Sequence, residues 1–372
     1  MDDPTLTDNT MKLFKIIGGM ALALALSPLL LAAKNDPHAL PVNISFTNPA
    51  IRYVGRFTKD DKGPRCGWPA SMVEIKFEGT DLQVKFKDEG RDFWQVILDG
   101  KPANILQLDK KQTVYPVVSG LPMQEHTVQL VKRTEAMVGT TQFLGFLANS
   151  RVKLLSITPP PHKMEVIGDS ISCGFGNEAT GKDIPFSPTT ENAYLAYGAV
   201  AARALHADYI CTAWSGKKLW PDNSIIPLYD SILPKEPEAT PWDFASWTPD
   251  VVVINLATND FGPRNPEEAG WTKAYIDFIG KIRKNYPSAH IYCMIGPMLT
   301  DLPADRKPLT TVRGYIQKVL EAFKDDPKIH SFDSGPQDGE SNGWGAQSHP
   351  SVKTDQIIGE KLAEVIQHDL GW

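Results

Sequence analysis

The sequence predicts two consecutive folds, an antiparallel β-sandwich over residues 41–157 and a doubly wound α/β fold over residues 160–372. Before the segment ITPPPH (157–162), short stretches that alternate apolar and polar residues are interrupted by Gly, Asp or Pro, which is typical of a sandwich. After it, apolar stretches alternate with helical patterns, which is typical of a parallel sheet covered by helices. The 372 residues are enough for two domains, each with its own core.

The N-terminal residues predict an export signal. Lys12 and Lys15 precede an apolar run that ends in small residues at about Ala33. We therefore expect a signal peptide over residues 1–33, with translation starting at Met11 because the acidic residues before it are unusual in a signal. An uncleaved anchor is the alternative, since the run approaches the length of a bilayer span. The mature protein is expected to be secreted or periplasmic, without a membrane partner.

Composition excludes some classes of function. The net charge of −6 without a long basic block argues against nucleic acid as a partner. The four cysteines form neither a CxxC pair nor a His/Cys zinc pattern, so their spacing indicates no zinc site. No cofactor is expected. Cys173 and Cys211 fall near the ends of two expected strands, where they form either a disulfide or, as we expect, small buried thiols. The oligomeric state is not determined by the sequence.

Each part has its own series of expected elements. The sandwich strands alternate apolar and polar residues in MVEIKFEG, DLQVKFK, WQVILDG and HTVQLVKRT. The parallel strands are expected at MEVIG, YICTAW, VVVINLA, HIYCMIG and KIHSFD. Helices are expected within NAYLAYGAVAARAL, AYIDFIGKIRKNY, VRGYIQKVLEAFK and QIIGEKLAEVIQ.

Polar motifs follow the ends of these parallel strands. GDSIS follows the first strand, SGK the second and TND the third, and an HP pair precedes the last helix. Ligands of open parallel sheets bind beyond the carboxyl ends of the strands, so these four segments are expected to meet at one cleft. Each motif alone is equally typical of an ordinary turn or helix cap, and only their convergence indicates a site.

Two residues have the chemistry of a nucleophile and its base. Ser170 lies where a strand turns toward a helix, with Gly168 allowing a tight turn. A serine is a weak nucleophile until a base takes its proton, and His349 is the best candidate base. The oxyanion formed on attack needs donors, for which the candidates are the N–H groups of Ser170 and Gly216 and the side-chain amide of Asn259.

These residues carry a family resemblance. The blocks containing Ser170, Gly216, Asn259 and His349 resemble the four conserved blocks of the SGNH hydrolases. The segments YVGR, LDG, KRTE and FLGF, followed by GDSISCGFGNE, ATND and SHPS, resemble carbohydrate esterase family 2 over nearly the whole mature chain. The resemblance implies a jelly-roll sandwich beside a flavodoxin-like SGNH-hydrolase domain with three α/β/α layers. It also implies an acetyl esterase for acetylated xylan or other carbohydrate, working without metal through an acetyl-serine.

The sequence departs from the family pattern beside the histidine. Relatives often read DWHP where this chain has Gln347, Ser348 and His349, and Ala346 stands where the wider superfamily commonly has Asp. An imidazole still needs a partner that fixes its tautomer. The resemblance offers a Ser–His dyad helped by backbone carbonyls. The alternative partners are Asp333, Asp338 and Glu340, each of which is otherwise expected to be a solvated loop carboxylate.

A second departure concerns the substrate, since the tryptophan beside the histidine of relatives is Ser348 here. Sugar rings pack well on aromatic faces. Trp214 and Trp344 are closest in sequence to the site motifs and are the candidate replacements, with core packing as the alternative. The remaining tryptophans considered are Trp220, Trp242 and Trp271.

The sequence thus predicts a serine esterase that removes acetyl groups from carbohydrate. A family-type sandwich and the lack of a long apolar lid argue against the first alternative, an SGNH esterase or thioesterase acting on lipid or another acyl substrate. The second alternative is a non-catalytic carbohydrate-binding relative, because the usual triad acid is missing.

Overall fold

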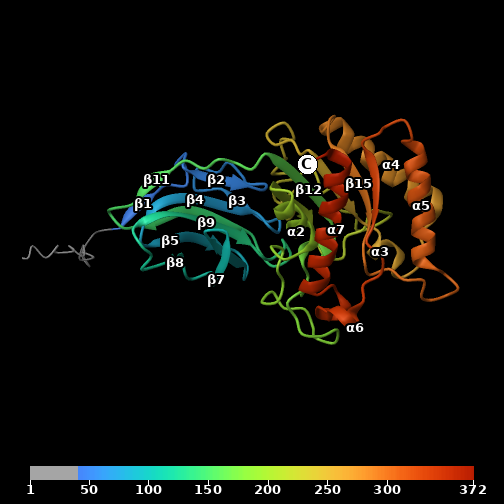
Figure 1. The fold of residues 1–372 in the computed structure, drawn as a ribbon, viewed down its shortest axis with the longest axis horizontal. Coiled ribbons are helices and arrows are strands. Elements are labelled where there is room, and N and C mark those ends of the chain that lie inside the picture. The colour runs from blue at the N-terminus through green and yellow to red at the C-terminus, as the bar shows by residue number, and fades with distance from the viewer. Residues whose placement is uncertain (1–40) are drawn as a thin grey trace, which may run out of the picture. The chain divides into compact units, whose positions relative to one another are not determined.

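The computed structural model describes residues 41–372, which Figure 1 shows as a β-rich part followed by an α/β part. The predicted signal peptide, residues 1–33 with its start at Met11, lies outside the described residues. None of the helices in residues 41–372 is long and apolar enough to cross a membrane.

Residues 42–155 form two antiparallel sheets, as the alternating pattern predicts. One sheet has the order β1–β10–β5–β8 with β3 beside β10, and the other has the order β11–β4–β9–β6–β7 with β2 beside β4. The bounds are β1 Val42–Ile44, β2 Ile51–Val54, β3 Arg65–Cys66, β4 Met72–Gly79, β5 Leu82–Asp88, β6 Phe93–Leu98, β7 Lys101–Gln107, β8 Val114–Val118, β9 Gln124–Lys132, β10 Thr141–Ala148 and β11 Lys153–Leu155.

The strand pattern explains how these sheets share a core. In β5, Leu82, Val84 and Phe86 are buried while Gln83 and Lys87 are exposed, so one face of the strand points inward. Apolar residues from both sheets form a single buried cluster. The sandwich prediction is therefore confirmed.

The second part is built on a parallel sheet of five strands. Its order is β13–β12–β14–β15–β16, so the first strand in the chain lies between the second and the third. The strands are β12 His162–Gly168, β13 Ala207–Ala213, β14 Val251–Asn255, β15 His290–Ile295 and β16 Ile329–Asp333. This is the flavodoxin-like order, in which all strands are parallel and the strand order reverses beside β12.

Helices cover both faces of this sheet. Val251 and Val253 of β14 share a cluster with α2 and α7, whereas Val252 and Ile254 share a cluster with α4 and α5. The helices are α1 Ser170–Cys173, α2 Tyr197–Ala204, α3 Thr258–Phe261, α4 Glu268–Asn285, α5 Pro308–Ala322, α6 Gly339–Asn342 and α7 Val352–Leu370. The three-layer α/β/α prediction is confirmed, and both faces of each central strand are apolar for this reason.

All four of the expected helices begin at other residues than their sequence patterns, and α2 and α7 show the reason. The segment expected to be helical from residue 192 begins its helix only at Tyr197, because the Asn192 side chain accepts the N–H of Tyr194 in a turn. Helix α7 begins earlier than its apolar pattern, since Ser351 caps it by accepting the N–H of Thr354.

Buried ion pairs join the sandwich to the parallel sheet. Arg52 of β2 pairs with Asp208 of β13 at 2.8 Å. Arg56 pairs with Glu165 of β12 at 2.8 Å, with both side chains at most 1% exposed. The described residues all belong to one compact unit, so the predicted domain division at residues 157–160 stays a prediction.

Candidate functional site

Ser170 lies at the carboxyl end of the central strand β12, as the motif order predicts. Gly168 ends the strand, and a Cβ there would overlap the side chain of Ser172, so the tight turn needs glycine. Asp169 then caps α1 by accepting the N–H of Ile171 at 3.0 Å. Ser170 is the first residue of this short helix and is 6% exposed.

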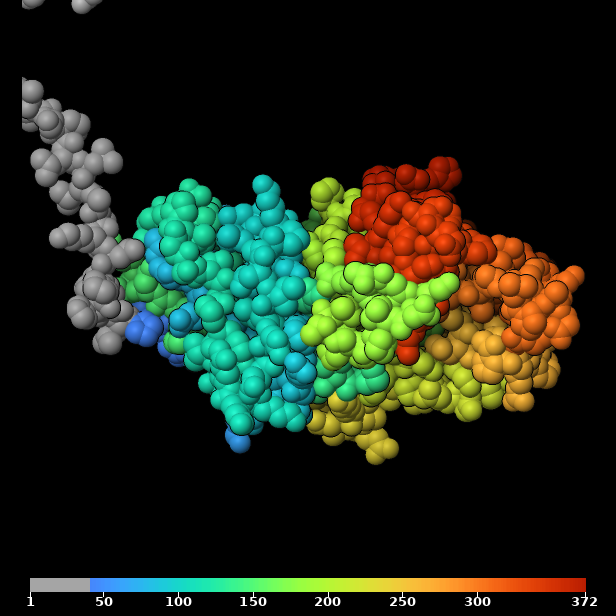
Figure 2. Space-filling model, turned by 90° about the horizontal axis from the view of Figure 1, so that it is seen from below, coloured from blue at the N-terminus to red at the C-terminus, as the bar shows by residue number. Residues whose placement is uncertain are grey.

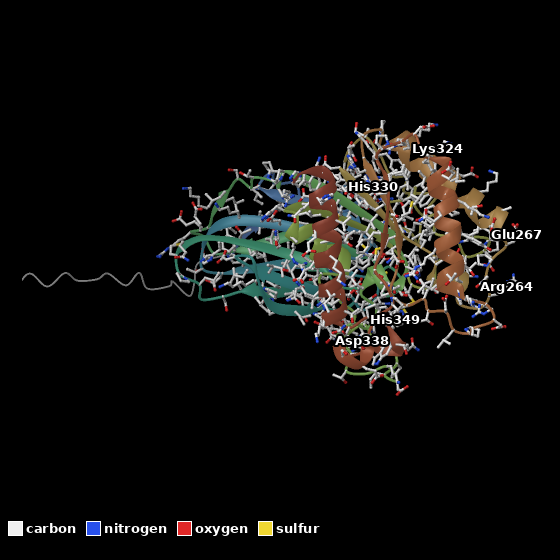
Figure 3. All side chains as sticks on the ribbon, turned by 45° about the vertical axis from the view of Figure 1, so that its right-hand side comes forward. Arg264, Glu267, Lys324, His330, Asp338 and His349 are labelled. Carbon is white, nitrogen blue, oxygen red and sulfur yellow. The ribbon has the colours of Figure 1, made fainter. Side chains whose placement is uncertain are left out.

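The predicted base meets the predicted nucleophile. Nε2 of His349 lies 2.9 Å from Oγ of Ser170, although the two residues are 179 positions apart in the chain. His349 belongs to the loop between α6 and α7, and Figure 3 shows it well apart from His330, which is on β16. This distance is that of a hydrogen bond between a hydroxyl and an imidazole.

A main-chain carbonyl supports the imidazole on its other side. Nδ1 of His349 lies 3.0 Å from the carbonyl oxygen of Ala346. A carbonyl can only accept, so Nδ1 carries the hydrogen and Nε2 is left free to accept the proton of Ser170. Burial lowers the pKa of His349 below its usual value of 6.5, while the carbonyls of Ala346 and Gln347 act in the opposite direction.

None of the three alternative carboxylates is hydrogen-bonded to His349 in the described chain. Asp333 pairs with Arg313 at 2.6 Å. Asp338 caps α6 by accepting the N–H of Ser341. Glu340 is exposed in the first turn of the same helix. Among the hydrogen bonds of residues 41–372, His349 has only the main-chain oxygen on its Nδ1 side, so the arrangement is the dyad that the resemblance offers.

An aromatic ring packs against the imidazole. The ring centroid of Phe175 lies 4.3 Å from that of His349, and Phe186 stacks on Phe175. The segment that carries both rings follows α1 and is coloured lime in Figure 2, where it lies between the sandwich and the red C-terminal part. In the same segment, the carbonyl of Gly176 accepts the N–H of Ala346, and the carbonyl of Ile184 accepts the N–H of Gln347.

Two of the three candidate oxyanion donors are unoccupied. The N–H groups of Ser170 and Gly216 have no acceptor within the described chain. Gly216 follows β13 with φ of +78°, and a Cβ there would have no heavy atom within 4 Å, so the space beside its N–H is open. A substrate oxygen can approach both groups from this side.

The third candidate, Asn259, is already hydrogen-bonded. Its amide nitrogen donates to Asp169 at 3.2 Å and to the carbonyl of Lys217 at 3.0 Å. Burial raises the pKa of Asp169 to about 7. Sequence reasoning missed this role of Asp169, although the residue stands inside the GDS motif. The two bonds tie the segments after β12, β13 and β14 together at one edge of the sheet.

The candidate tryptophans flank this edge. Trp214 follows β13 and is half-buried, with the ammonium of Lys217 5.4 Å from its ring. Trp344 is half-buried, pairs with Pro350 beside the histidine, and packs on Gly339. By contrast, Trp271 is fully buried in the core, and Trp242 packs on Arg56 at the sandwich junction. Trp220 packs against the same core as Trp271.

All four cysteines are free and buried, which agrees with the expected thiols. Burial raises the pKa of Cys211 to about 12, and its Sγ donates to the carbonyl of Ser172 at 3.4 Å. The Cys211 thiol therefore contacts α1 through this hydrogen bond and does not form a disulfide with Cys173.

Comparison with known proteins places both parts of the chain. Residues 53–160 match the family model "Carbohydrate esterase 2 N-terminal", and residues 166–357 match the "GDSL-like Lipase/Acylhydrolase family". A solved structure of a family two carbohydrate esterase from Clostridium thermocellum in complex with cellohexaose is 39% identical, with a TM-score of 0.82. The match covers 87% of this chain and 99% of that one.

Two curated proteins are similar over most of this chain. The cellulase/esterase CelE of Acetivibrio thermocellus is 40% identical over 334 residues, which are 87% of this chain but 40% of CelE. An acetylxylan esterase / glucomannan deacetylase of Cellvibrio japonicus is 28% identical over 323 residues, which are 82% of this chain and 85% of that protein. The chain thus spans less than half of the first relative and most of the second.

Proposed function

Because the chain belongs to carbohydrate esterase family 2, we propose that it removes O-acetyl groups from carbohydrate, with Ser170 as the nucleophile and His349 as its base. The observation that carries the proposal is the 2.9 Å contact between these two side chains at the carboxyl edge of the sheet. The open N–H groups of Ser170 and Gly216 beside it support the same assignment.

The proposed reaction has two halves. In the first, His349 takes the proton of Ser170 as its oxygen attacks the acetyl carbonyl, and the sugar hydroxyl leaves with the proton that His349 returns. In the second, His349 activates water in the same way, and acetate is released. The oxyanion of both halves is bound by the N–H groups of Ser170 and Gly216. Asn259 joins them if the oxyanion replaces the carbonyl of Lys217 as acceptor of one of its N–H groups.

The proposed substrate is an acetylated β-linked polysaccharide or oligosaccharide. The relatives are named for cellulase, acetylxylan esterase and glucomannan deacetylase activities, and one of the solved relatives holds cellohexaose. Trp214 and Trp344 are the proposed sugar contacts, since both rings are partly exposed next to segments that carry Gly216 and His349.

A second candidate function is glycan binding without turnover. The complex of a family member with cellohexaose favours it, because that ligand is not an acetyl ester. The complete pairing of Ser170 with His349 favours the esterase instead. Binding of cello-oligosaccharides together with no release of acetate from any acetylated sugar would establish the second function.

Export is part of the proposal. The apolar run that follows Lys12 and Lys15 predicts a signal peptide, and the relatives are named for activities on plant cell-wall polysaccharides. We propose that the mature protein is secreted or periplasmic. N-terminal sequencing of the exported protein should begin near residue 34, and a protein retained in the cytoplasm would refute export.

Ser170→Ala tests the esterase directly. Wild-type protein should release acetate from singly acetylated sugars and from p-nitrophenyl acetate, and the variant should lose about 10⁴-fold or more in kcat. Removing one small hydroxyl should leave the Tm nearly unchanged. Following acetate release by position of the acetyl group also identifies the preferred hydroxyl. Equal turnover by wild type and variant would exclude Ser170 as the nucleophile.

A further inference from the structure

A buried carboxylate of the sandwich reaches the oxyanion side of the site. Glu135 belongs to the KRTE segment that follows β9, and it is fully buried. One of its oxygens accepts the backbone N–H of Ser215 at 2.8 Å, and the other accepts the hydroxyl of Ser215. Ser215 is the residue directly before Gly216. A single side chain therefore holds both the backbone and the side chain of this residue.

The KRTE segment is itself rigidly held. The ammonium of Lys132 donates to Asp92 at 2.7 Å and to the carbonyls of Thr134 and Glu135. Lys132 and Asp92 are both completely buried. Arg133 donates to the main chain at Glu191 and pairs with Glu178. The buried Lys132–Asp92 pair, with its other hydrogen bonds made, holds the main chain of this segment in place. The side chain of Glu135 therefore starts from a fixed backbone position.

A second carboxyl group stands behind Glu135. Glu191 accepts the backbone N–H of Glu135 at 3.2 Å, and Cys173 lies in the same buried group. Burial raises the pKa of both carboxyls, that of Glu191 well above its usual value. Because both oxygens of Glu135 accept from Ser215, the ionised form of Glu135 is stabilised, and we assign the neutral form to Glu191.

We propose that Glu135 is a positioning residue for the esterase reaction: by holding Ser215, it aims the N–H of Gly216 at the oxyanion that forms beside Ser170. The inference rests on the proposed function. The loop from Trp214 to Lys217 is a turn, with the N–H of Lys217 donating to the carbonyl of Trp214 at 3.2 Å. Gly216 in this turn has no side chain and faces open space, so neighbouring residues must fix the direction of its N–H.

Through Glu135, the sandwich would contribute to catalysis. An oxyanion donor acts through its preorganised direction, and a donor that must reorient during the reaction loses much of its effect. The residue that preorganises Gly216 comes from the sandwich, whereas Ser170, Gly216, Asn259 and His349 all come from the α/β part. The sandwich would then be required for turnover as well as for stability.

The test compares Glu135→Gln and Ser215→Ala with Asp208→Asn. Ser215→Ala removes the hydroxyl contact, whereas Glu135→Gln removes the negative charge and replaces one of the two acceptor oxygens by an NH2 donor. Asp208→Asn weakens the pair with Arg52 across the same junction, at the opposite end of β13. It is therefore a control for loosened contact between the two parts of the chain.

We expect Glu135→Gln to lower kcat roughly 10- to 100-fold with KM within about twofold of wild type, because the lost interaction acts on the transition state. Ser215→Ala should lower kcat less, and the double variant should be no worse than Glu135→Gln, since both act through one contact. Asp208→Asn should lower Tm without this selective loss of kcat.

Three outcomes would overturn the positioning role. They are an unchanged kcat in both site variants, additive effects in the double variant, or a loss of kcat in Asp208→Asn as large as that in Glu135→Gln. If Glu135→Gln does not fold, the kcat of Ser215→Ala decides: a selective loss of kcat supports the positioning role, and an unchanged kcat overturns it. A wild-type protein that releases no acetate would instead refute the proposed function, and the positioning role with it.

Discussion

His349 is oriented by a main-chain oxygen, in a position where most serine hydrolases use a carboxylate. A carbonyl dipole fixes the tautomer as well as a carboxylate does, but it stabilises the imidazolium less because it carries no net charge. The cation is also poorly solvated, since the ring is packed against Phe175. Burial therefore outweighs the two carbonyls, and the pKa of His349 is lowered.

The lowered pKa predicts the pH dependence of the reaction. His349 must be neutral to act as a base, so kcat/KM should fall only as the pH drops through its pKa in the free enzyme. This pKa lies below 6.5, and activity should therefore persist at mildly acidic pH. Measurement of kcat/KM on p-nitrophenyl acetate from pH 4 to 8 checks this expectation.

Asp169 could also contribute to the pH profile, because burial raises its pKa to about 7, within the range of pH 4 to 8. A variant at this position therefore serves as the control. Asp169→Asn removes that titration and keeps a good helix cap. The limb that remains in the variant belongs to His349. A remaining midpoint at or above 6.5 would contradict the assignment.

At the level of elements, the turn over residues 346–348 determines which atom faces the imidazole. Gln347 and Ser348 have φ values of +51° and +62°, which turn the chain so that the carbonyl of Ala346 points back at Nδ1. Ala346 is fully buried against Gly176 and the aromatic pair of Phe175 and Phe186. A longer acidic side chain at position 346 has no room here, which explains why a carbonyl replaces it.

Gly176→Ala should disrupt this turn. A Cβ at Gly176 would overlap the Cβ of Ala346, and the φ of +56° already strains any residue other than glycine. We expect a loss of more than about 1 kcal/mol in the free energy of unfolding. The displaced carbonyl should also cost about tenfold or more in kcat. Urea denaturation and steady-state kinetics measure the two effects.

Gly314→Ala in α5 is the matched control. The position is exposed and helical, and a Cβ there meets no atom within 4 Å. This variant should gain about 0.5–1 kcal/mol of stability with unchanged kcat, because alanine has the higher helix propensity. Equal behaviour of the two glycine variants would show that the turn does not depend on Gly176.

Across the whole molecule, buried charges join the sandwich to the sheet. Glu165 of β12 accepts from Arg56 and also from Thr212 at 2.9 Å. The guanidinium lies 5.0 Å from the rings of both Tyr229 and Trp242. Such a pair is costly to break on one side only, because the remaining charge stays buried without its partner.

Glu165→Gln should therefore destabilise the protein by about 3 kcal/mol or more. The double replacement of Arg56 by Met and Glu165 by Leu should cost less than the single change, since it leaves no unpaired charge. Asp277→Asn is the control, because its pair with Lys273 is more than 60% exposed on both sides and should matter by about 0.5 kcal/mol at most. Similar losses from Glu165→Gln and Asp277→Asn in urea denaturation would refute the argument.

The sequence by itself determined the sandwich, the parallel sheet, the segments after strand ends that carry Ser170, Gly216 and Asn259, and the place of His349 before the last helix. These features depend on local periodicity and on residue types that have a definite chemistry, and both are visible in one sequence. The order of the motifs was sufficient for the site because parallel strands bring their carboxyl ends to one edge.

The tertiary structure alone decided what supports His349 and what holds Gly216. A carbonyl oxygen belongs to every residue, so no residue type could identify that of Ala346, and the sequence could not choose between it and three nearby carboxylates. The contact of Glu135 with Ser215 joins residues 80 positions apart. Contacts of this kind depend on how the sandwich packs against the parallel sheet, which local sequence patterns do not specify.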